Sequence, residues 1–216
     1  GLLYIIPLLF FTFKNFLKKE KIISLYLIFL LIVFQGLIGW YMVKSGLTER
    51  TDVSHYRLSL HLIVAFIIFI LLIWNYLSIN FKKEINTSKK IPYNMSFLFL
   101  LLILLQVLTG AFVSGLDAGQ IYNSWPLMNE FYFPSDSSLN ELFSINFLNV
   151  PSLVQFIHRN IAYLIIMFFF ILIILVYLDE DFIYLRKSIL LILVTLSIQF
   201  ILGILTILSG AQIVIA

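Results

Sequence analysis

Long apolar runs separated by short polar segments dominate the chain. A helix needs roughly 20 apolar residues to cross the hydrocarbon core of a bilayer. Five runs are long enough and predict complete spans: Ile22–Val43, Leu58–Ile79, Ser96–Gly115, Leu153–Leu178 and Ser188–Ser209. Gly1–Phe13 is shorter and predicts part of a further span. The pattern therefore predicts an all-α fold, a polytopic transmembrane helical bundle with about five complete helices and one partial helix.

Composition strengthens this interpretation. The 216 residues are 62% hydrophobic and 12% charged, whereas soluble domains hold roughly 45–50% apolar and about 25% charged residues. We therefore expect membrane lipid as the surroundings and no nucleic-acid partner. The absence of cysteine excludes disulfides, thiolate haem ligands and iron–sulfur clusters. Because both ends lie in apolar sequence and the first residue is not Met, we interpret the chain as part of a longer protein.

The placement of basic residues predicts the orientation of the spans. The first, third and fifth loops carry most of them: Lys14, Lys18, Lys19, Lys21, Lys82, Lys83, Lys89, Lys90, Arg186 and Lys187. The fourth loop, Asp117–Val150, has neither Lys nor Arg. Cytoplasmic loops are enriched in Lys and Arg. We therefore expect the basic loops in the cytoplasm and Asp117–Val150 on the opposite side of the membrane.

An internal repeat links three alternate spans. Gln35 and Gly39, Gln106 and Gly110, and Gln199 and Gly203 have the same spacing, and each pair precedes a Ser-Gly helix exit. Small residues also favour ordinary close packing of membrane helices, which is the alternative explanation. Three copies on helices that run in the same direction favour duplicated halves.

Two histidines lie inside predicted spans. His61 and His158 are each about two turns from a helix start, and each is followed four residues later by an alanine. Residues i and i+4 share a helix face, so a flat macrocycle has room beside each ring. Neutral imidazole is a common ligand of haem iron. The matched depths favour haem ligation over the alternative, a histidine hydrogen-bonded to another helix. His55 does not share a face with His61, and we expect it to be solvated.

Two arginines accompany these histidines. Arg57 lies four residues before His61, and Arg159 follows His158 directly. Arginine binds carboxylates well, so both are candidate partners of haem propionates. The alternative is that each side chain snorkels to the membrane surface. Zinc is the weaker hypothesis for the histidines, because no Cys or carboxylate accompanies either one inside its span.

Three motifs resemble one known family. Gly115–Met128 reads GLDAGQIYNSWPLM, Val154–Arg159 reads VQFIHR, and Val53–His61 reads VSHYRLSLH. They resemble the haem A synthase family of the proteobacterial and mitochondrial kind, and the likeness extends over all 216 residues. This resemblance implies eight helices in two pseudo-repeated four-helix halves, each of which holds a haem between two histidines.

The resemblance also implies how the chain is divided. Residues 1–81 would belong to the N-terminal half, 82–95 to a cytoplasmic linker, and 96–216 to the C-terminal half. His61 would be the ligand on helix 4, and His158 the ligand on helix 6. The partner histidines and a helix 2 glutamate implicated in the chemistry would lie outside this chain. The catalytic residue is therefore unknown, and we expect the chain alone to be inactive.

The function implied by the resemblance is that of an oxidoreductase. Members oxidise the C8 methyl group of haem O to a formyl group, which makes haem A for cytochrome oxidase. Haem O is the substrate and haem b the cofactor. The expected location is the bacterial inner membrane, or the mitochondrial inner membrane in a eukaryote. The electron acceptor, a contact with haem O synthase and a homo-oligomeric state stay open.

Two other functions remain as alternatives. A quinol-linked cytochrome b would use the same histidines for electron transfer, although such subunits commonly carry histidines near both ends of a helix. A cofactor-free transporter would explain the repeated Gln and Gly positions, although the Pro-broken helices of a midplane site are missing. The duplication further predicts one ligand histidine beyond Ala216 and another shortly before Gly1. Asp117–Val150 lacks Lys and Arg but holds Trp125, Leu127 and Met128, so we expect this loop to pack over the second haem.

Overall fold

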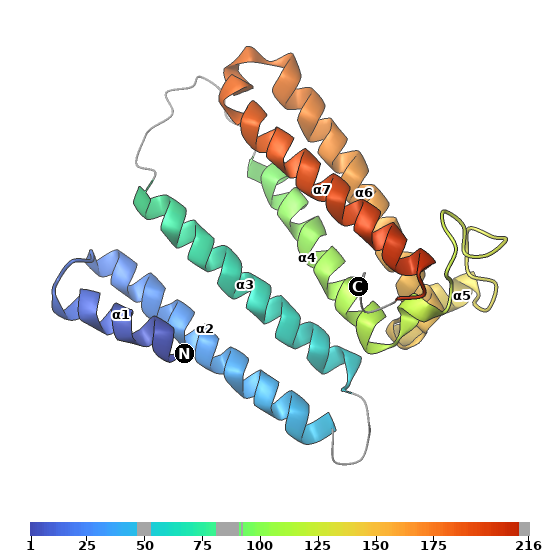
Figure 1. The fold of residues 1–216 in the computed structure, drawn as a ribbon, viewed down its shortest axis with the longest axis horizontal. Helices are drawn as coiled ribbons and strands as arrows, with labels where there is room; N and C mark the ends of the chain where they lie inside the picture. The colour runs from blue at the N-terminus through green and yellow to red at the C-terminus, as the bar shows by residue number, and fades with distance from the viewer. Residues whose placement is uncertain (47–52, 81–90, 92, 212–216) are drawn as a thin grey trace. The chain divides into compact units, whose positions relative to one another are not determined.

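The computed structural model describes residues 1–46, 53–80, 91 and 93–211. In chain order its elements are α1 (Leu2–Phe13), α2 (Lys19–Gly46), α3 (His55–Asn80), α4 (Tyr93–Gly115), η1 (Ala118–Gln120), α5 (Leu139–Leu142), η2 (Ile145–Asn149), α6 (Pro151–Leu178), η3 (Glu180–Leu185) and α7 (Arg186–Leu208) (Figure 1). These residues form no β-strand, only one isolated bridge between Met128 and Phe131. The predicted all-α fold is confirmed.

The five long helices match the five predicted spans. By length and composition, α2, α3, α4, α6 and α7 are each suited to crossing a membrane. Their outward faces expose large apolar side chains such as Leu37, Leu101 and Phe170, which in water would be unfavourable over so large an area. The chain is therefore a multi-pass membrane protein. Most of the predicted linker 82–95, including its four lysines, lies outside the described residues, as does the segment beyond Ala211.

Contacts divide the chain into two units, Gly1–Ile85 and Asn86–Ala216. In the first unit, α2 and α3 form an antiparallel pair. Ser24 donates a hydrogen bond to the side-chain oxygen of Asn75 at one end, 3.2 Å away, and Arg57 donates to Ser45 at the other, 2.6 Å away. Between these ends the pair buries Ile28, Ile38, Val64 and Ile68.

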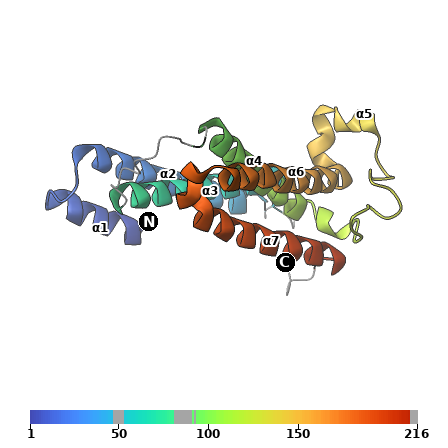
Figure 2. The same ribbon diagram turned by 90° about the horizontal axis from the view of Figure 1, so that it is seen from above.

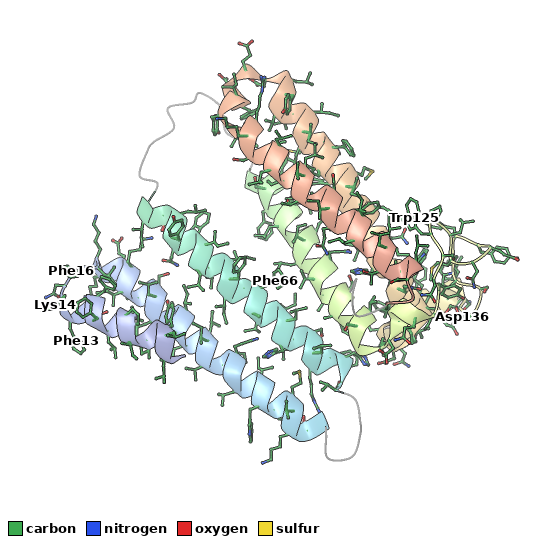
Figure 3. The ribbon with its side chains drawn as sticks, viewed as in Figure 1. Phe13, Lys14, Phe16, Phe66, Trp125 and Asp136 are labelled. Atoms are coloured by element: carbon green, nitrogen blue, oxygen red, sulfur yellow. The ribbon has the colours of Figure 1, made fainter. Side chains whose placement is uncertain are left out.

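Helix α1 packs against α2 within the first unit. The hydroxyl of Tyr4 donates to the main-chain carbonyl of Leu25 at 3.0 Å, and its ring stacks on Phe29. The turn that joins the two helices holds Phe13, Lys14 and Phe16 (Figure 3). A basic residue flanked by exposed aromatic rings is typical of a membrane interface, which agrees with the expected position of this turn.

The second unit is built on α6. This helix begins at Pro151, where a missing N–H costs nothing because the first helical N–H groups have no partner. It packs against both α4 and α7. Phe169, Leu172 and Val176 of α6 form a core with Phe182 and Ile189. Figure 2 shows α6 and α7 side by side, with α5 beyond the first turns of α6.

The loop between α4 and α6 is ordered and folded upon itself. Ser138 and Glu141 form a reciprocal capping box around α5, and the hydroxyl of Tyr122 donates to Asp136 at 3.0 Å. Trp125 and Asp136 mark the two arms of the loop beyond the ends of α4 and α6 (Figure 3). The loop packs on the first turns of α6, where Leu153 and Gln155 are fully buried.

Candidate functional site

In the first unit, His61 of α3 lies against Gly39 of α2. A Cβ atom at Gly39 would be 3.0 Å from Cε1 of the ring, 3.6 Å from Nδ1 and 3.8 Å from Nε2. A separation of 3.0 Å is shorter than ordinary carbon contacts, so the ring occupies space that any larger residue would take. Gln35 lies one turn earlier on α2 and donates to the main-chain carbonyl of His61 at 2.9 Å.

In the second unit, His158 of α6 lies against Gly110 of α4 in the same way. A Cβ atom there would be 3.2 Å from Cε1, 3.8 Å from Nδ1 and 4.0 Å from Nε2. Gln106 again lies one turn earlier, but its amide nitrogen meets the ring itself, 3.1 Å from Nε2. The hydroxyl of Thr109 is 3.0 Å from Nδ1. Both ring nitrogens of His158 therefore have polar partners on α4.

The two sites show what the repeated glycine does. In both units the glycine stands four residues after the glutamine, and the Cε1 edge of a histidine ring points at it. The sequence alone attributed these small residues to helix packing or to duplication. The structure adds that the glycine accommodates the histidine ring. In the third copy of the repeat, a Cβ atom at Gly203 of α7 would meet none of the described residues within 4 Å.

Arg57 is engaged at the end of the α2–α3 pair. It donates to the hydroxyl of Ser45 at 2.6 Å, and its guanidinium lies 4.9 Å from the ring centroid of Tyr41. It lies on the same face of α3 as His61, because residues four apart share a helix face. The suggested pairing of Arg57 with a propionate stays a prediction.

Arg159 is buried and holds the loop. Its terminal nitrogens donate to the main-chain carbonyls of Tyr122 at 2.8 Å, Ser124 at 2.9 Å and Leu127 at 3.4 Å. Gln155, one turn earlier, donates to the same carbonyl of Tyr122 at 3.1 Å. A propionate partner for Arg159 stays a prediction, and such a partner would have to share the guanidinium with these carbonyls.

His55 is half-buried at the start of α3, and its ring centroid lies 4.3 Å from that of Tyr56.

Thr109 and Gln155 are site residues that sequence reasoning missed. Thr109 had a weak signal, since it lies between the repeated Gln106 and Gly110. Gln155 lies inside the Val154–Arg159 motif, but a single amide three residues before a histidine is common in any helix and indicated no partner.

The histidine sites fit haem better than a metal ion held by protein alone. Within the described residues, no three His, Cys, Asp or Glu side chains lie close enough to bind one ion. Each histidine thus offers one ligand, as iron in a macrocycle requires at an axial position. Several buried polar atoms also have no partner among the residues that the structure describes: Nδ1 of His61 and Oε1 of Gln35 in the first unit, and Oε1 of Gln106, Nε of Arg159 and the hydroxyl of Tyr163 in the second.

Comparison with known proteins decides the family. The COX15-CtaA family, described as cytochrome oxidase assembly protein, matches residues 1–216. The chain belongs to this family. A COX15-CtaA relative named heme A synthase, from Pelagibacter ubique, is 46% identical over 224 residues, which covers 100% of this chain and 63% of the relative.

Two further relatives carry the same name. The heme A synthase of Wolbachia pipientis wMel is 37% identical over 219 residues, covering 100% of this chain and 60% of the relative. That of Rickettsia bellii strain RML369-C is 43% identical over 168 residues, covering 76% of this chain and 49% of the relative. The chain thus spans less than two thirds of the length of these COX15-CtaA proteins. No solved structure matches it.

Proposed function

We propose that the protein is a haem A synthase, which oxidises the C8 methyl group of haem O to a formyl group. The observation that carries the proposal is the pair of equivalent histidine sites. His61 and His158 lie at similar depths in two spans, and each ring packs on a glycine one turn after a glutamine. Membership in the COX15-CtaA family and the names of the relatives support the same function.

In this proposal His61 and His158 would each hold one haem, one of the two being haem b and the other haem O. Haem iron supplies the redox chemistry when bound, and the chain's own residues orient the ring and exclude water. Nε2 of His158 would be the nitrogen offered to iron, and it would then give up its hydrogen bond to Gln106. Arg57 and Arg159 are the candidate partners for propionates. No residue of this chain is assigned as the acid or base of the oxidation.

The proposal extends to organisation and location. Residues 1–81 and 96–216 belong to two duplicated four-helix halves, joined by a cytoplasmic linker at 82–95. The protein lies in the bacterial inner membrane, with Asp117–Val150 outside the cytoplasm. The support is the repeat, the distribution of Lys and Arg, and the ordered packing of this loop on the helix that carries His158.

The test uses the protein expressed from its complete coding sequence. His158→Ala and His61→Ala should each remove the absorbance of one bis-histidine haem, and either should abolish formation of haem A from haem O. His55→Gln is the matched control, since His55 lies on α3 but off the face of His61, and it should retain both haems.

The outcomes separate the alternatives. Haem absorbance without any haem A product would favour an electron-transfer cytochrome b. A wild-type protein that binds no haem would favour a transporter and end the proposal. Loss of haem in His55→Gln, with retention in His61→Ala, would show that the wrong histidine of α3 had been assigned.

A further inference from the structure

Thr109 meets the ring of His158 on the side away from Gln106. Its hydroxyl oxygen is 3.0 Å from Nδ1. The same hydroxyl is 2.9 Å from the main-chain carbonyl of Leu105 and 3.2 Å from that of Gln106. Thr109 is buried, so these three groups are its immediate polar neighbours among the described residues.

The proton count favours one direction for these bonds. A threonine hydroxyl has one proton to donate, and main-chain carbonyls can only accept. A threonine inside a helix commonly gives its proton to a carbonyl three or four residues earlier. With its proton given to a carbonyl, the oxygen of Thr109 faces the ring as an acceptor, and Nδ1 of His158 then carries the ring proton. Nε2 then has a free lone pair, which accepts from the amide of Gln106.

We propose that Thr109 is a positioning residue that keeps His158 in the tautomer protonated at Nδ1, with Nε2 directed to haem iron. This inference rests on the proposed function. A hydrogen bond from the remote ring nitrogen to an acceptor fixes the tautomer and orientation of a ligating histidine and increases its donor strength. A stronger donor stabilises ferric over ferrous iron, so Thr109 lowers the midpoint potential of the second haem.

Among its described residues, the first unit has no hydroxyl in the position equivalent to that of Thr109. The residue three positions after Gln35 is Ile38, which is buried and has no polar side-chain atom. Nδ1 of His61 is buried as well, and it has no hydrogen-bond partner among the residues that the structure describes. The two histidines therefore differ in donor strength although their helices are arranged alike. The difference comes from one side chain on the neighbouring helix, Thr109 in the second unit and Ile38 in the first.

Thr109→Val tests the role of the hydroxyl with little change in volume. The variant is made in the His61→Ala background, so that a single haem reports its potential. We expect the preference of the haem iron for the ferric over the ferrous state to fall by up to about tenfold. This corresponds to a rise in the midpoint potential of roughly 59 mV. Thr109→Ser, which keeps the hydroxyl, should restore the original value. An unchanged potential in Thr109→Val, or a Thr109→Ser variant that behaves like Thr109→Val, would overturn the inference.

The reciprocal substitution provides a test that does not depend on the stability of Thr109→Val. Ile38→Thr, made in the His158→Ala background, adds a hydroxyl beside His61 and should lower the potential of the first haem by a similar amount. Ile38→Val is the control of matched shape and should leave it unchanged. Equal potentials in both variants would contradict the proposed role of the hydroxyl.

A measurement without haem separates this inference from the proposed function. In haem-free protein labelled with ¹⁵N-histidine, the signals that disappear in His158→Ala should report a neutral ring protonated at Nδ1. Protonation at Nε2 would overturn the inference even if haem A is formed. Protonation at Nδ1 in a protein that never binds haem would support the hydrogen bond and end the proposed function instead.

Discussion

His61 and His158 share one backbone frame and differ in their polar surroundings. Each ring lies edge-on to a glycine, with the ring-to-glycine distances equal within about 0.2 Å between the two units. Around His158, Gln106 and Thr109 engage both ring nitrogens. Around His61, the corresponding glutamine bonds the main chain instead. The two copies of the repeat thus provide the same space for a histidine ring, but they differ in the hydrogen bonds that the ring accepts or donates.

The two arginines that accompany these histidines also differ in their polar contacts. Arg57 contacts one hydroxyl and one aromatic ring near the end of α3. Arg159 is buried and bonds three carbonyls of a loop that the first unit does not have among its described residues. In the second unit, the helix that carries the histidine is therefore also bonded to an ordered loop. The following substitutions test how much the two units differ in stability and in haem binding.

The largest effect is expected at Arg159. Arg159→Met keeps an apolar stem but leaves the carbonyls of Tyr122, Ser124 and Leu127 without their donor. Hydrogen bonds to charged groups contribute roughly 1.5–3 kcal/mol each, and not additively, so we expect a local loss of about 3 kcal/mol. That is about a hundredfold rise in the open population. Native-state cleavage by chymotrypsin at the aromatic residues of the loop measures it.

Arg57→Met is the matched control for this test. Arg57 makes one hydrogen bond to a hydroxyl and one cation–aromatic contact worth about 0.5–1 kcal/mol, so Arg57→Met should destabilise the α2–α3 pair less than Arg159→Met destabilises the loop. The comparison between the two arginines would fail if both variants altered proteolysis of the loop equally.

The glycines come next. Gly39→Leu and Gly110→Leu place a side chain where the histidine ring lies, and overpacking of this kind costs about 1–3 kcal/mol. Each should lower the haem affinity of its own half roughly ten- to hundredfold, as measured by haem content after purification. Gly36→Leu is the control on α2, because a Cβ atom there meets nothing within 4 Å. A loss of haem in Gly36→Leu as large as in Gly39→Leu would refute the role of Gly39.

The two glutamine substitutions should give smaller effects that differ between the two units. Gln106→Leu removes a bond to Nε2 that ligation must displace, and a net hydrogen bond of about 1 kcal/mol predicts a roughly fivefold gain in haem affinity. Gln35→Leu removes a bond to the backbone of His61 and should leave the affinity of the first haem within about twofold. Haem titration of the haem-free protein distinguishes them, and equal changes at both sites would show that the difference in hydrogen bonding is unimportant.

Topology can be tested without changing stability. Because the chain has no cysteine, single cysteines report position cleanly. Lys14→Cys, in the turn of the first unit, should react from the cytoplasmic side, and Asn140→Cys, on the exposed face of α5, from the opposite side. Asn140 suits labelling better than Ser137, whose hydroxyl contacts Ser152. Reaction of both from one side would refute the predicted orientation.

Much of the fold was predictable from the sequence. The predicted spans Ser96–Gly115 and Leu153–Leu178 end at the same residues as α4 and α6. These features are local, because apolar run length and helix-terminating residues act within a few positions. The ordering of Asp117–Val150 was less predictable, since it depends on Arg159 and Gln155 donating to carbonyls more than thirty positions away.

The sequence by itself determined that this protein is a multi-pass helical membrane protein with a repeated Gln and Gly pattern and two matched histidines. Only the tertiary structure decided that the glycines accommodate the histidine rings, that Thr109 faces Nδ1 of His158, and that Ile38 stands in the equivalent place beside His61. The reason is physical. Helix formation depends on neighbours in sequence, whereas a side chain's partner depends on which residue of another helix lies opposite it.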